Sequence, residues 1–198
     1  RMRAGRSVRK MILSESCTAS RRLWVTIRGV VGRADQTSVR SVRSRADVTV
    51  LGNHDAAVCG RMDYSFYRAA ARQALDWHGR RISGSHRKWL SGLPYVHRLG
   101  DIAFSHASPL ALEEFEYIFV LDQMRDIVEH YESQAAVTFI GHSHLCKSFS
   151  YDALVAEEVL RTRFVLEPDR KYVITVGSVG QPRDYDARAC CGLFDTQT

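Results

Sequence analysis

The chain carries short apolar runs that stop at a glycine and are followed at once by polar side chains. One run covers residues 48–51 and leads into Gly-Asn-His-Asp at 52–55. Another covers residues 136–140 and leads into Gly-His-Ser-His at 141–144. Runs of this length and composition predict buried strands that end at the glycine. Because ligands of α/β sheets bind beyond the carboxyl ends of the strands, the pattern predicts a shared ligand site.

Between these two runs the apolar spacing predicts helices. The first is a core-facing helix of about four turns that ends at Gly79. A shorter helix capped by Ser85 and ending near Gly92 follows it, and a third helix covers residues 121–131. The apolar positions that define the first helix are Met62, Phe66, Ala70, Ala74 and Trp77.

The remaining apolar segments predict strands. Residues 95–99 and 102–105 flank Gly100-Asp101 and predict a hairpin. Helices interleave with strands at first and strands dominate later, so the order predicts an α/β sandwich with antiparallel additions rather than a pure doubly wound sheet. The other predicted strands cover 23–27, 147–151, 164–167, 172–176 and 191–194.

The composition is that of an ordinary globular domain, with 45% hydrophobic and 25% charged residues in 198 positions. No apolar run approaches the length of a membrane span, and no apolar region of a signal peptide follows the basic start. The five cysteines show no CxxC spacing. We therefore predict a cytoplasmic protein without a membrane partner, and the start at Arg1 favours a fragment.

Positive charge is concentrated at the start of the chain. Residues 1–46 hold twelve Lys and Arg against Glu15 and Asp35, a net charge of +10 that leaves −4 for the rest. We interpret 1–42 as a basic, atypical segment ahead of one domain over 43–198. Such an Arg- and Ser-rich segment is typical either of a solvated, disordered leader or of a nucleic-acid-binding arm.

Four side chains that follow apolar strands are candidate metal ligands: Asn53, His106, His142 and His144. Imidazole binds zinc, iron, nickel and manganese to different degrees, and the amide oxygen of Asn suits the harder divalent ions. His142 and His144 are two positions apart and would point the same way on a regular strand. A single histidine at a strand end is more often a hydrogen-bonded structural residue, so the prediction depends on the set.

His54 and Asp55 indicate proton transfer rather than metal binding. A carboxylate beside an imidazole can fix its tautomer and raise its pKa, as a general acid requires. A protonated His54 near a bound phosphate would donate to the leaving oxygen. As an alternative, Asp55 caps a following helix, and the two roles are compatible.

The ordered motifs at 52–55, His106-Ala-Ser-Pro109 and 141–144 resemble those of the calcineurin-like metallophosphoesterase superfamily. The segment Gly-Ser-Val-Gly-Gln-Pro-Arg at 177–183 is similar to the closing motif of its bacterial branch, often labelled as phosphodiesterases or diadenosine-tetraphosphatase-like phosphatases. The resemblance covers residues 43–195. It implies a four-layer α-β-β-α sandwich that hydrolyses phosphate mono- or diesters by a metal-bound hydroxide.

The resemblance also implies two divalent metals, commonly manganese, iron, zinc or nickel. On matching positions, one metal would be held by Asn53, His106 and His142, and the second by His144.

The same resemblance implies roles for the residues around the metals. His54, oriented by Asp55, would protonate the leaving group, and Arg183 would contact the phosphate. The expected partner is a phosphate-ester small molecule or a nucleotide. Monoesters, diesters, dinucleoside polyphosphates and phosphoproteins share this metal core, so the motifs do not choose among them.

The sequence departs from the family pattern before Gly52. The Asp-x-His and Gly-Asp motifs are absent there, Arg28 lies near the expected bridging position, and 11–15 is the best remnant of a first strand. We therefore expect the first strand and helix to be degenerate or absent, one metal at most to bind well, and hydrolysis to be impaired. Three interpretations stay open: a truncated or frame-disrupted member, a natural pseudoenzyme, or a protein with substitute ligands.

Two other classes of function stay open beside the enzyme. One is a non-catalytic binding module of the same fold that contacts nucleic acid through the basic N-terminal segment. The other is a zinc-binding structural protein, which is the weakest interpretation because the chain has no CxxC pair.

Overall fold

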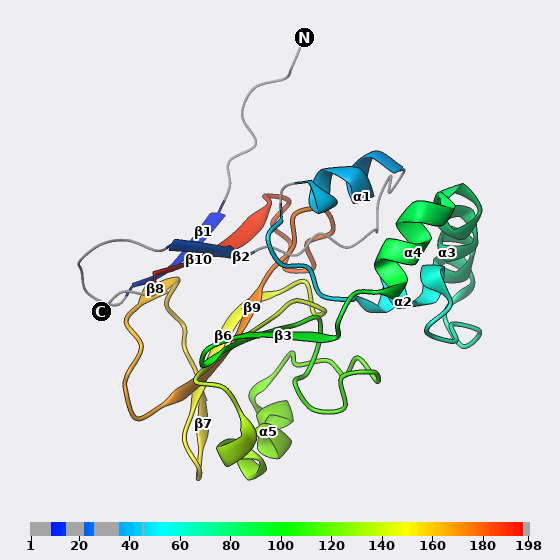
Figure 1. Ribbon diagram of the computed structural model, residues 1–198. Helices are drawn as coiled ribbons and strands as arrows, with labels where there is room; N and C mark the ends of the chain where they lie inside the picture. Colours follow the sequence, from blue (N-terminus) through cyan, green and yellow to red (C-terminus); the bar gives the residue numbers. More distant parts are fainter. Residues whose placement is uncertain (1–8, 15–21, 26–35, 45, 196–198) are drawn as a thin grey trace.

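The computed structural model describes residues 9–14, 22–25, 36–44 and 46–195, and Figure 1 labels most of its elements. The strands are β1 (Arg9–Ser14), β2 (Arg22–Val25), β3 (Val96–Leu99), β4 (Ile102–Ser105), β5 (Val137–Ile140), β6 (Cys146–Tyr151), β7 (Ala156–Glu158), β8 (Arg163–Phe164), β9 (Lys171–Val176) and β10 (Cys190–Asp195). The helices are α1 (Gln36–Arg43), α2 (Asn53–Cys59), α3 (Ala69–Arg81), α4 (Gly84–Ser91) and α5 (Arg125–Glu129), with 3₁₀ turns η1 (Leu121–Met124) and η2 (Tyr131–Ser133).

The larger sheet has the strand order β3-β4-β5-β9-β6-β7. Its three inner neighbours β4, β5 and β9 run parallel, so their carboxyl ends meet at one edge. The strands β3, β6 and β7 pair antiparallel with their neighbours. The sheet therefore has the predicted combination of parallel strands and antiparallel additions.

The smaller sheet has the strand order β2-β10-β1-β8 and joins the two ends of the described chain. β1 runs parallel to β10, with Arg9 opposite Cys190 and Ser14 opposite Asp195. The strand predicted at 23–27 is present as β2, and the expected remnant of a first strand forms β1. Arg28 lies outside the described residues. The boundary after residue 42 stays a prediction.

The two sheets enclose the main core. Tyr172 and Ile174 on β9 face Phe194 of β10, while Val173 faces the opposite side, as the two-residue period of a strand requires. On that opposite side, residues of η1 and α5 such as Met124 cover the larger sheet. Helices, a six-stranded sheet and a second sheet thus confirm the predicted α/β sandwich.

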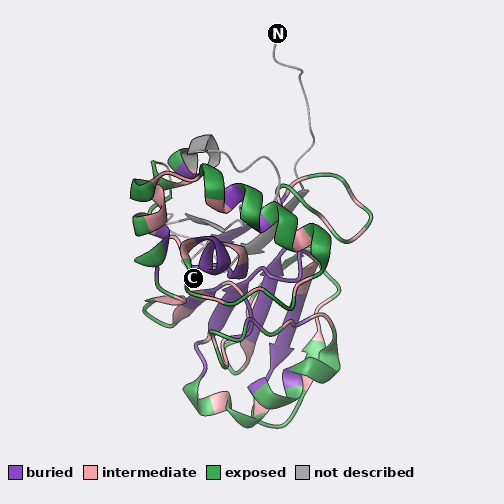
Figure 2. Cartoon of the chain, turned by 90° about the vertical axis from the view of Figure 1, so that its right-hand side faces the viewer, coloured by how far each residue is buried: buried purple, intermediate pink, exposed green. Residues whose placement is uncertain are grey.

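The helices α1 to α4 lie together beside the two sheets (Figure 1). α2 packs on α4 around Leu51 and Leu90, and on α3 around Leu75. Figure 2 shows the strands and the inner faces of these helices as buried and the outer helix faces as exposed. The group of helices holds the start of α2, which carries the first polar motif, near the edge of the larger sheet.

The predicted strand over 48–51 is wrong as a paired element. In the structure this segment is irregular and joins neither sheet, and Val48 is 44% exposed. Leu51 is fully buried and donates its N–H to Pro94 O at 2.8 Å. Helix α2 begins at Asn53, directly after the turn at Gly52.

The predicted core face of the first long helix is also wrong. Helix α3 begins only at Ala69, because Asp63 accepts from Ser65 N–H and forms a local turn instead. Phe66 is 71% exposed, whereas the residues of α3 that are buried are Leu75 and His78. The helix also continues past Gly79 to Arg81.

Other predicted elements lie close to their expected places. The hairpin β3–β4 turns at Gly100, whose φ of 58° is favoured by glycine. The cap of α4 is Ser83, whose side chain accepts from His86 N–H, rather than Ser85. β8 is shorter than the predicted strand over 164–167. Within the described residues, none of the helices combines the length and apolarity needed to traverse a bilayer.

Candidate metal centre

The candidate ligands come together because three parallel strands end side by side. His106 follows β4, His142 follows β5, and the segment 177–183 follows β9. The carbonyl of His106 accepts from Gly141 N–H at 2.9 Å and from His142 N–H at 2.7 Å. The backbone therefore fixes the two imidazole-bearing residues beside each other.

Three donor atoms converge at this edge of the sheet. His106 Nε2 lies 3.0 Å from Asn53 Oδ1 and 3.0 Å from His142 Nδ1. A neutral imidazole carries one N–H, so Nε2 can donate to only one of these two atoms. A metal ion shared among the three atoms removes that conflict, and imidazole with amide oxygen is a suitable ligand set for a divalent ion.

Gly52 permits the close approach of these groups. A Cβ built at Gly52 would lie 3.0 Å from His106 Nδ1 and 3.2 Å from Asp55 Oδ2. A larger residue would push His106 away from the converging atoms. The residues present therefore fit a metal site that is formed by Asn53, His106 and His142.

A tyrosine orients the amide of Asn53. Asn53 is 6% exposed, and its Nδ2 donates to Tyr67 Oη at 2.7 Å. This bond turns the amide oxygen towards His106. Tyr67 carries no sequence motif, because it lies in the irregular segment before α3, and sequence reasoning missed it.

His144 is positioned differently from His142. It lies in a turn with a φ of 59°, so the expectation that both side chains project alike from a regular strand is wrong. Its Nδ1 lies 2.7 Å from Gln181 O, which leaves Nε2 as the nitrogen available to a ligand. Gln181 belongs to the glycine-rich segment that sequence analysis singled out, although without a role for this residue.

Burial keeps the histidines of the cluster neutral. It is the main cause that lowers the pKa of His142 to about 3, with the Arg183 charge next. Burial likewise holds the pKa of His106 well below its usual value and lowers that of His144. Neutral imidazoles have the free lone pair that metal binding requires.

His54 and Asp55 differ from the sequence expectation. Burial first, and then His144, His78 and Arg183, lower the pKa of His54 to about 4, so the expected rise is wrong. Asp55 Oδ2 accepts from Gly52 N–H at 3.3 Å, and Oδ1 has no hydrogen-bond partner. Asp55 therefore caps α2, and the structure shows no hydrogen bond from it to His54. Burial raises the pKa of Asp55 to about 7.

Arg183 lies beside the histidines of the cluster, and its backbone N–H donates to His144 O at 3.5 Å. Its side chain is exposed, and its positive charge contributes to the lowered pKa values of His54, His142 and His144. An exposed guanidinium close to these imidazoles is suited to attract an anionic group.

Aromatic rings cover the cluster on another side. The Tyr117 ring stacks on the His142 ring with centroids 3.8 Å apart, and on Phe119 at 4.5 Å. Phe115 lies edge-on to His106 at 5.8 Å. These rings limit the positions that His106 and His142 can take, and no pattern in the sequence identified them.

A second metal would find few ligands in the described part of the chain. There, no three His, Cys, Asp or Glu side chains are grouped so that they could hold a metal ion. The described cluster therefore consists of two imidazoles and one amide, with His144 beside it. The expectation of one well-held metal at most stays a prediction.

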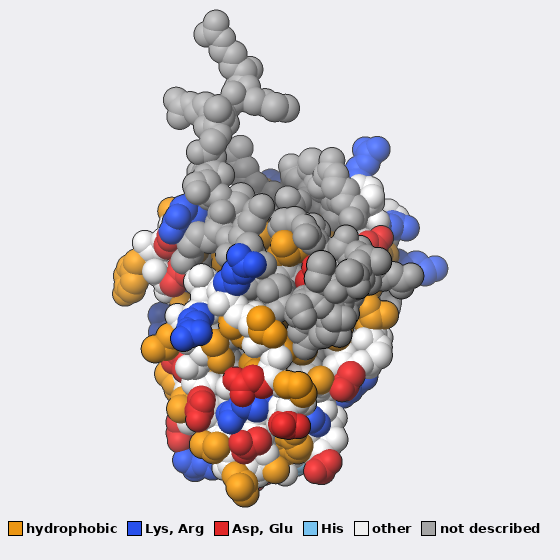
Figure 3. All heavy atoms as spheres, turned by 90° about the vertical axis from the view of Figure 1, so that its left-hand side faces the viewer, with side chains coloured by type: hydrophobic (Ala, Val, Ile, Leu, Met, Phe, Trp, Pro, Cys, Tyr) orange, Lys and Arg blue, Asp and Glu red, His pale blue; other side chains and the backbone are white. Residues whose placement is uncertain are grey.

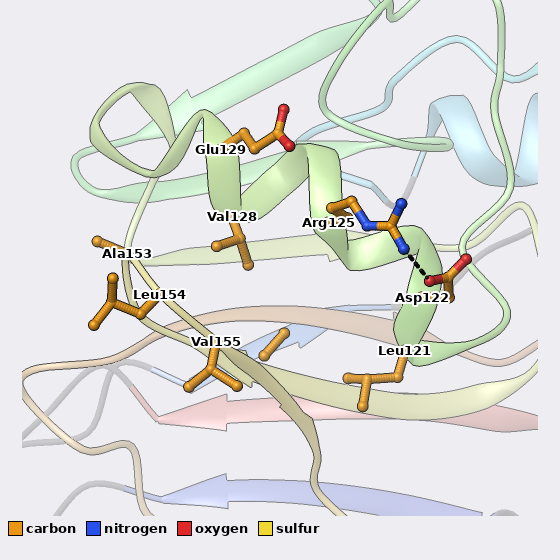
Figure 4. Close-up of a pocket in the computed structure, with 9 residues that line it drawn as sticks. Leu121, Asp122, Arg125, Val128, Glu129, Ala153, Leu154 and Val155 are labelled. Carbon is orange, nitrogen blue, oxygen red and sulfur yellow. Dashed lines mark hydrogen bonds and ion pairs between the residues drawn. The ribbon is translucent and has the colours of Figure 1, made fainter.

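A hollow of about 430 Å³ lies elsewhere, between η1–α5 and the loop after β6 (Figure 4). Its lining is mostly apolar, and the exposed pair Arg125–Asp122 at 2.7 Å lies at its rim. None of the candidate site residues lines it. The chemistry is therefore assigned to the strand ends and not to this hollow.

The structure shares its α/β sandwich with a metallophosphoesterase of known structure, so the fold is that of a phosphoesterase. That protein comes from Sphaerobacter thermophilus, and the match has a TM-score of 0.60 and 27% identity over 80% of this chain and 66% of the other. A hypothetical protein from Pyrococcus horikoshii has a TM-score of 0.51 at 14% identity, over 81% of this chain and 67% of the other, which supports the fold alone.

Comparison of sequences gives one curated relative. An uncharacterized protein of Methanocaldococcus jannaschii is 31% identical over 163 residues, which are 79% of this chain. The chain spans 63% of the length of that relative. No family model matches the chain.

Proposed function

We propose that the chain is a metal-dependent phosphoesterase that holds one divalent metal between Asn53, His106 and His142. The observation that carries the proposal is that Asn53 Oδ1 and His142 Nδ1 each lie 3.0 Å from His106 Nε2. When bound, a divalent metal would act as a Lewis acid on a phosphoryl oxygen. The substrates would be phosphate mono- or diesters, and the metal would be manganese, iron, zinc or nickel. The protein would be located in the cytoplasm.

Two side chains near the three ligands would act on the substrate: one would bind the phosphate and the other would protonate the leaving group. Arg183 is exposed and beside the histidines, and would attract the anion. His54 is neutral near pH 7 without substrate, because its pKa is about 4. An adjacent phosphate dianion favours the protonated imidazole, so substrate binding would raise the pKa of His54 towards the range of a proton donor.

We expect hydrolysis to be slow. In the described residues, the further histidines beside the three ligands are His54 and His144, and Asp55 is occupied with the cap of α2. Without a shared carboxylate, two dications would repel each other across the site. This is why the proposal includes a single well-held metal.

Turnover of bis-p-nitrophenyl phosphate in added Mn²⁺ tests the proposed function. We expect weak turnover that EDTA abolishes and that His142→Ala reduces at least about tenfold, as removal of a ligand should. His130→Ala is the matched control, because His130 is exposed and bonded to Asp126 O. Hydrolysis that survives both EDTA and His142→Ala would exclude the proposed site.

The alternative is a binding module that contacts nucleic acid through its basic N-terminal segment. Figure 3 shows acidic, basic and apolar side chains intermixed over the described part of one face, without a continuous basic patch. β1 lies in the basic segment and pairs with β10, so binding must be tested with the whole chain. Affinity for DNA or RNA that falls steeply with salt, together with absence of hydrolysis, would favour this alternative.

A further inference from the structure

Two cysteines from different sheets lie against each other next to the candidate metal centre. Cys146 is the first residue of β6 in the larger sheet, and Cys190 is the first residue of β10 in the smaller one. Cys190 Sγ donates to Cys146 Sγ at 3.2 Å, and no disulfide joins the two sulfurs. A disulfide has a sulfur–sulfur distance of about 2.05 Å, so a movement of about 1 Å would join them.

The backbone holds both cysteines to one segment of the chain. Gly177 N–H donates to Leu145 O at 2.9 Å, and Cys190 N–H donates to Ser178 O at 2.9 Å. Gly177 has a φ of 71°, and a Cβ built on it would lie 2.6 Å from Cys190 Cβ. Only glycine at this position lets Cys190 approach Cys146 so closely.

We propose that Cys146 and Cys190 are a modification site at which a low-molecular-weight disulfide forms a reversible link between the two sheets. Cys146 is partly exposed and Cys190 is 1% exposed, so Cys146 reacts first. Its thiolate displaces one thiol from the oxidant and forms a mixed disulfide. The Cys190 sulfur then attacks Cys146 Sγ and releases the second thiol, so two protein thiols become one disulfide and the oxidant becomes two thiols.

The link would fix the segment that carries Gln181 and Arg183. This segment leaves the larger sheet at Gly177 and returns to the smaller sheet at Cys190, where the disulfide would close it. Gln181 O contacts His144 Nδ1 at 2.7 Å, so the oxidised form would also hold that imidazole in place. The link closes a long loop, and we expect oxidation to raise the melting temperature by about 5 °C or more.

The test is incubation of the purified, metal-free chain with oxidised glutathione, followed by alkylation with N-ethylmaleimide and trypsin digestion. We expect a mass loss of two hydrogens and a linked pair of the peptides 126–147 and 189–198. The second peptide contains both Cys190 and Cys191, so Cys191→Ser assigns the link. The linked pair and the gain in melting temperature should persist in Cys191→Ser and in the control Cys59→Ser.

Loss of the linked pair in Cys146→Ser and in Cys190→Ser, each still folded by circular dichroism, would support the site. A stable glutathione adduct on Cys146 without the internal link would overturn the proposal, as would a link that persists in Cys190→Ser. The result does not depend on phosphoesterase activity, so failure of one proposal leaves the other standing.

Discussion

At the scale of single residues, the candidate centre depends on neighbours that bind no metal themselves. Tyr67 turns the amide of Asn53, and Gln181 O fixes His144. Such neighbours decide which atom of a ligand faces the metal and are often as important as the ligand. Tyr67 and Gln181 are distant in sequence from the residues they contact, with Tyr67 fourteen positions after Asn53. No local sequence pattern therefore predicts these contacts.

Replacement of Tyr67 by Phe should weaken metal binding while leaving the fold intact. The hydroxyl that accepts from Asn53 Nδ2 is lost, so the amide can rotate its oxygen away from His106. We expect affinity for Mn²⁺ to fall roughly 10- to 100-fold by calorimetric titration. Tyr64→Phe is the matched control, because Tyr64 bonds to the exposed Asp76 instead. Equal affinities of the two variants would remove Tyr67 from the centre.

Asp55 should make stability depend on pH. Burial raises its pKa from 3.8 to about 7 in the folded protein. Because the folded value exceeds the unfolded one, its stabilising contribution is complete below the unfolded pKa and is lost as pH rises through about 7. As the pH rises from about 5 to about 8, the free energy of unfolding of the wild type should therefore fall by about 3 kcal/mol relative to that of Asp55→Asn.

Denaturant titrations in EDTA at each pH measure this difference. The exposed Asp169→Asn is the control and should follow the wild type. Curves for Asp55→Asn and wild type that stay parallel over this range would show that Asp55 ionises without penalty in the folded state.

At the scale of elements, strand ends were predictable and helix faces were not. The run 136–140 is apolar apart from one threonine, which is β-branched and also favours strands, so the predicted bounds of β5 are right within one residue. The helix predicted over 62–77 is wrong because apolar spacing alone cannot show that Asp63 and Ser65 form a turn. It also cannot show that small alanine side chains can remain exposed to solvent. The contact of α3 with α2 instead buries Leu75 against Ala57 and Val58.

This difference between predicted and observed helix faces can be measured. Leu75→Ala should reduce the free energy of unfolding by about 2–5 kcal/mol, because the side chain is 1% exposed and leaves a cavity. Phe66→Ala, at a position 71% exposed, should change it by at most about 0.5 kcal/mol. A larger loss of unfolding free energy in Phe66→Ala than in Leu75→Ala would show that the buried helix face is the one predicted from the sequence.

At the scale of the whole molecule, the order of motifs predicted the sandwich, and the parallel strands β4, β5 and β9 explain why. The carboxyl ends of these strands bring His106, His142 and the segment after Val176 to one edge of the sheet. Because each motif follows its strand in the sequence, the order of the motifs predicts this arrangement. The sign of the pKa shift of His54 could not be read in this way. It depends on burial and then on the charges of His144, His78 and Arg183, which only the folded chain brings together.

The most direct test of the central claim is the number of metal ions bound per chain. Calorimetric titration with Mn²⁺, checked by elemental analysis after dialysis, should give one tightly bound ion per chain. That ion should be lost in His142→Ala and retained in the control His130→Ala. Two ions of similar affinity per chain, with rapid turnover of bis-p-nitrophenyl phosphate, or no ion bound at all, would contradict a centre built on Asn53, His106 and His142.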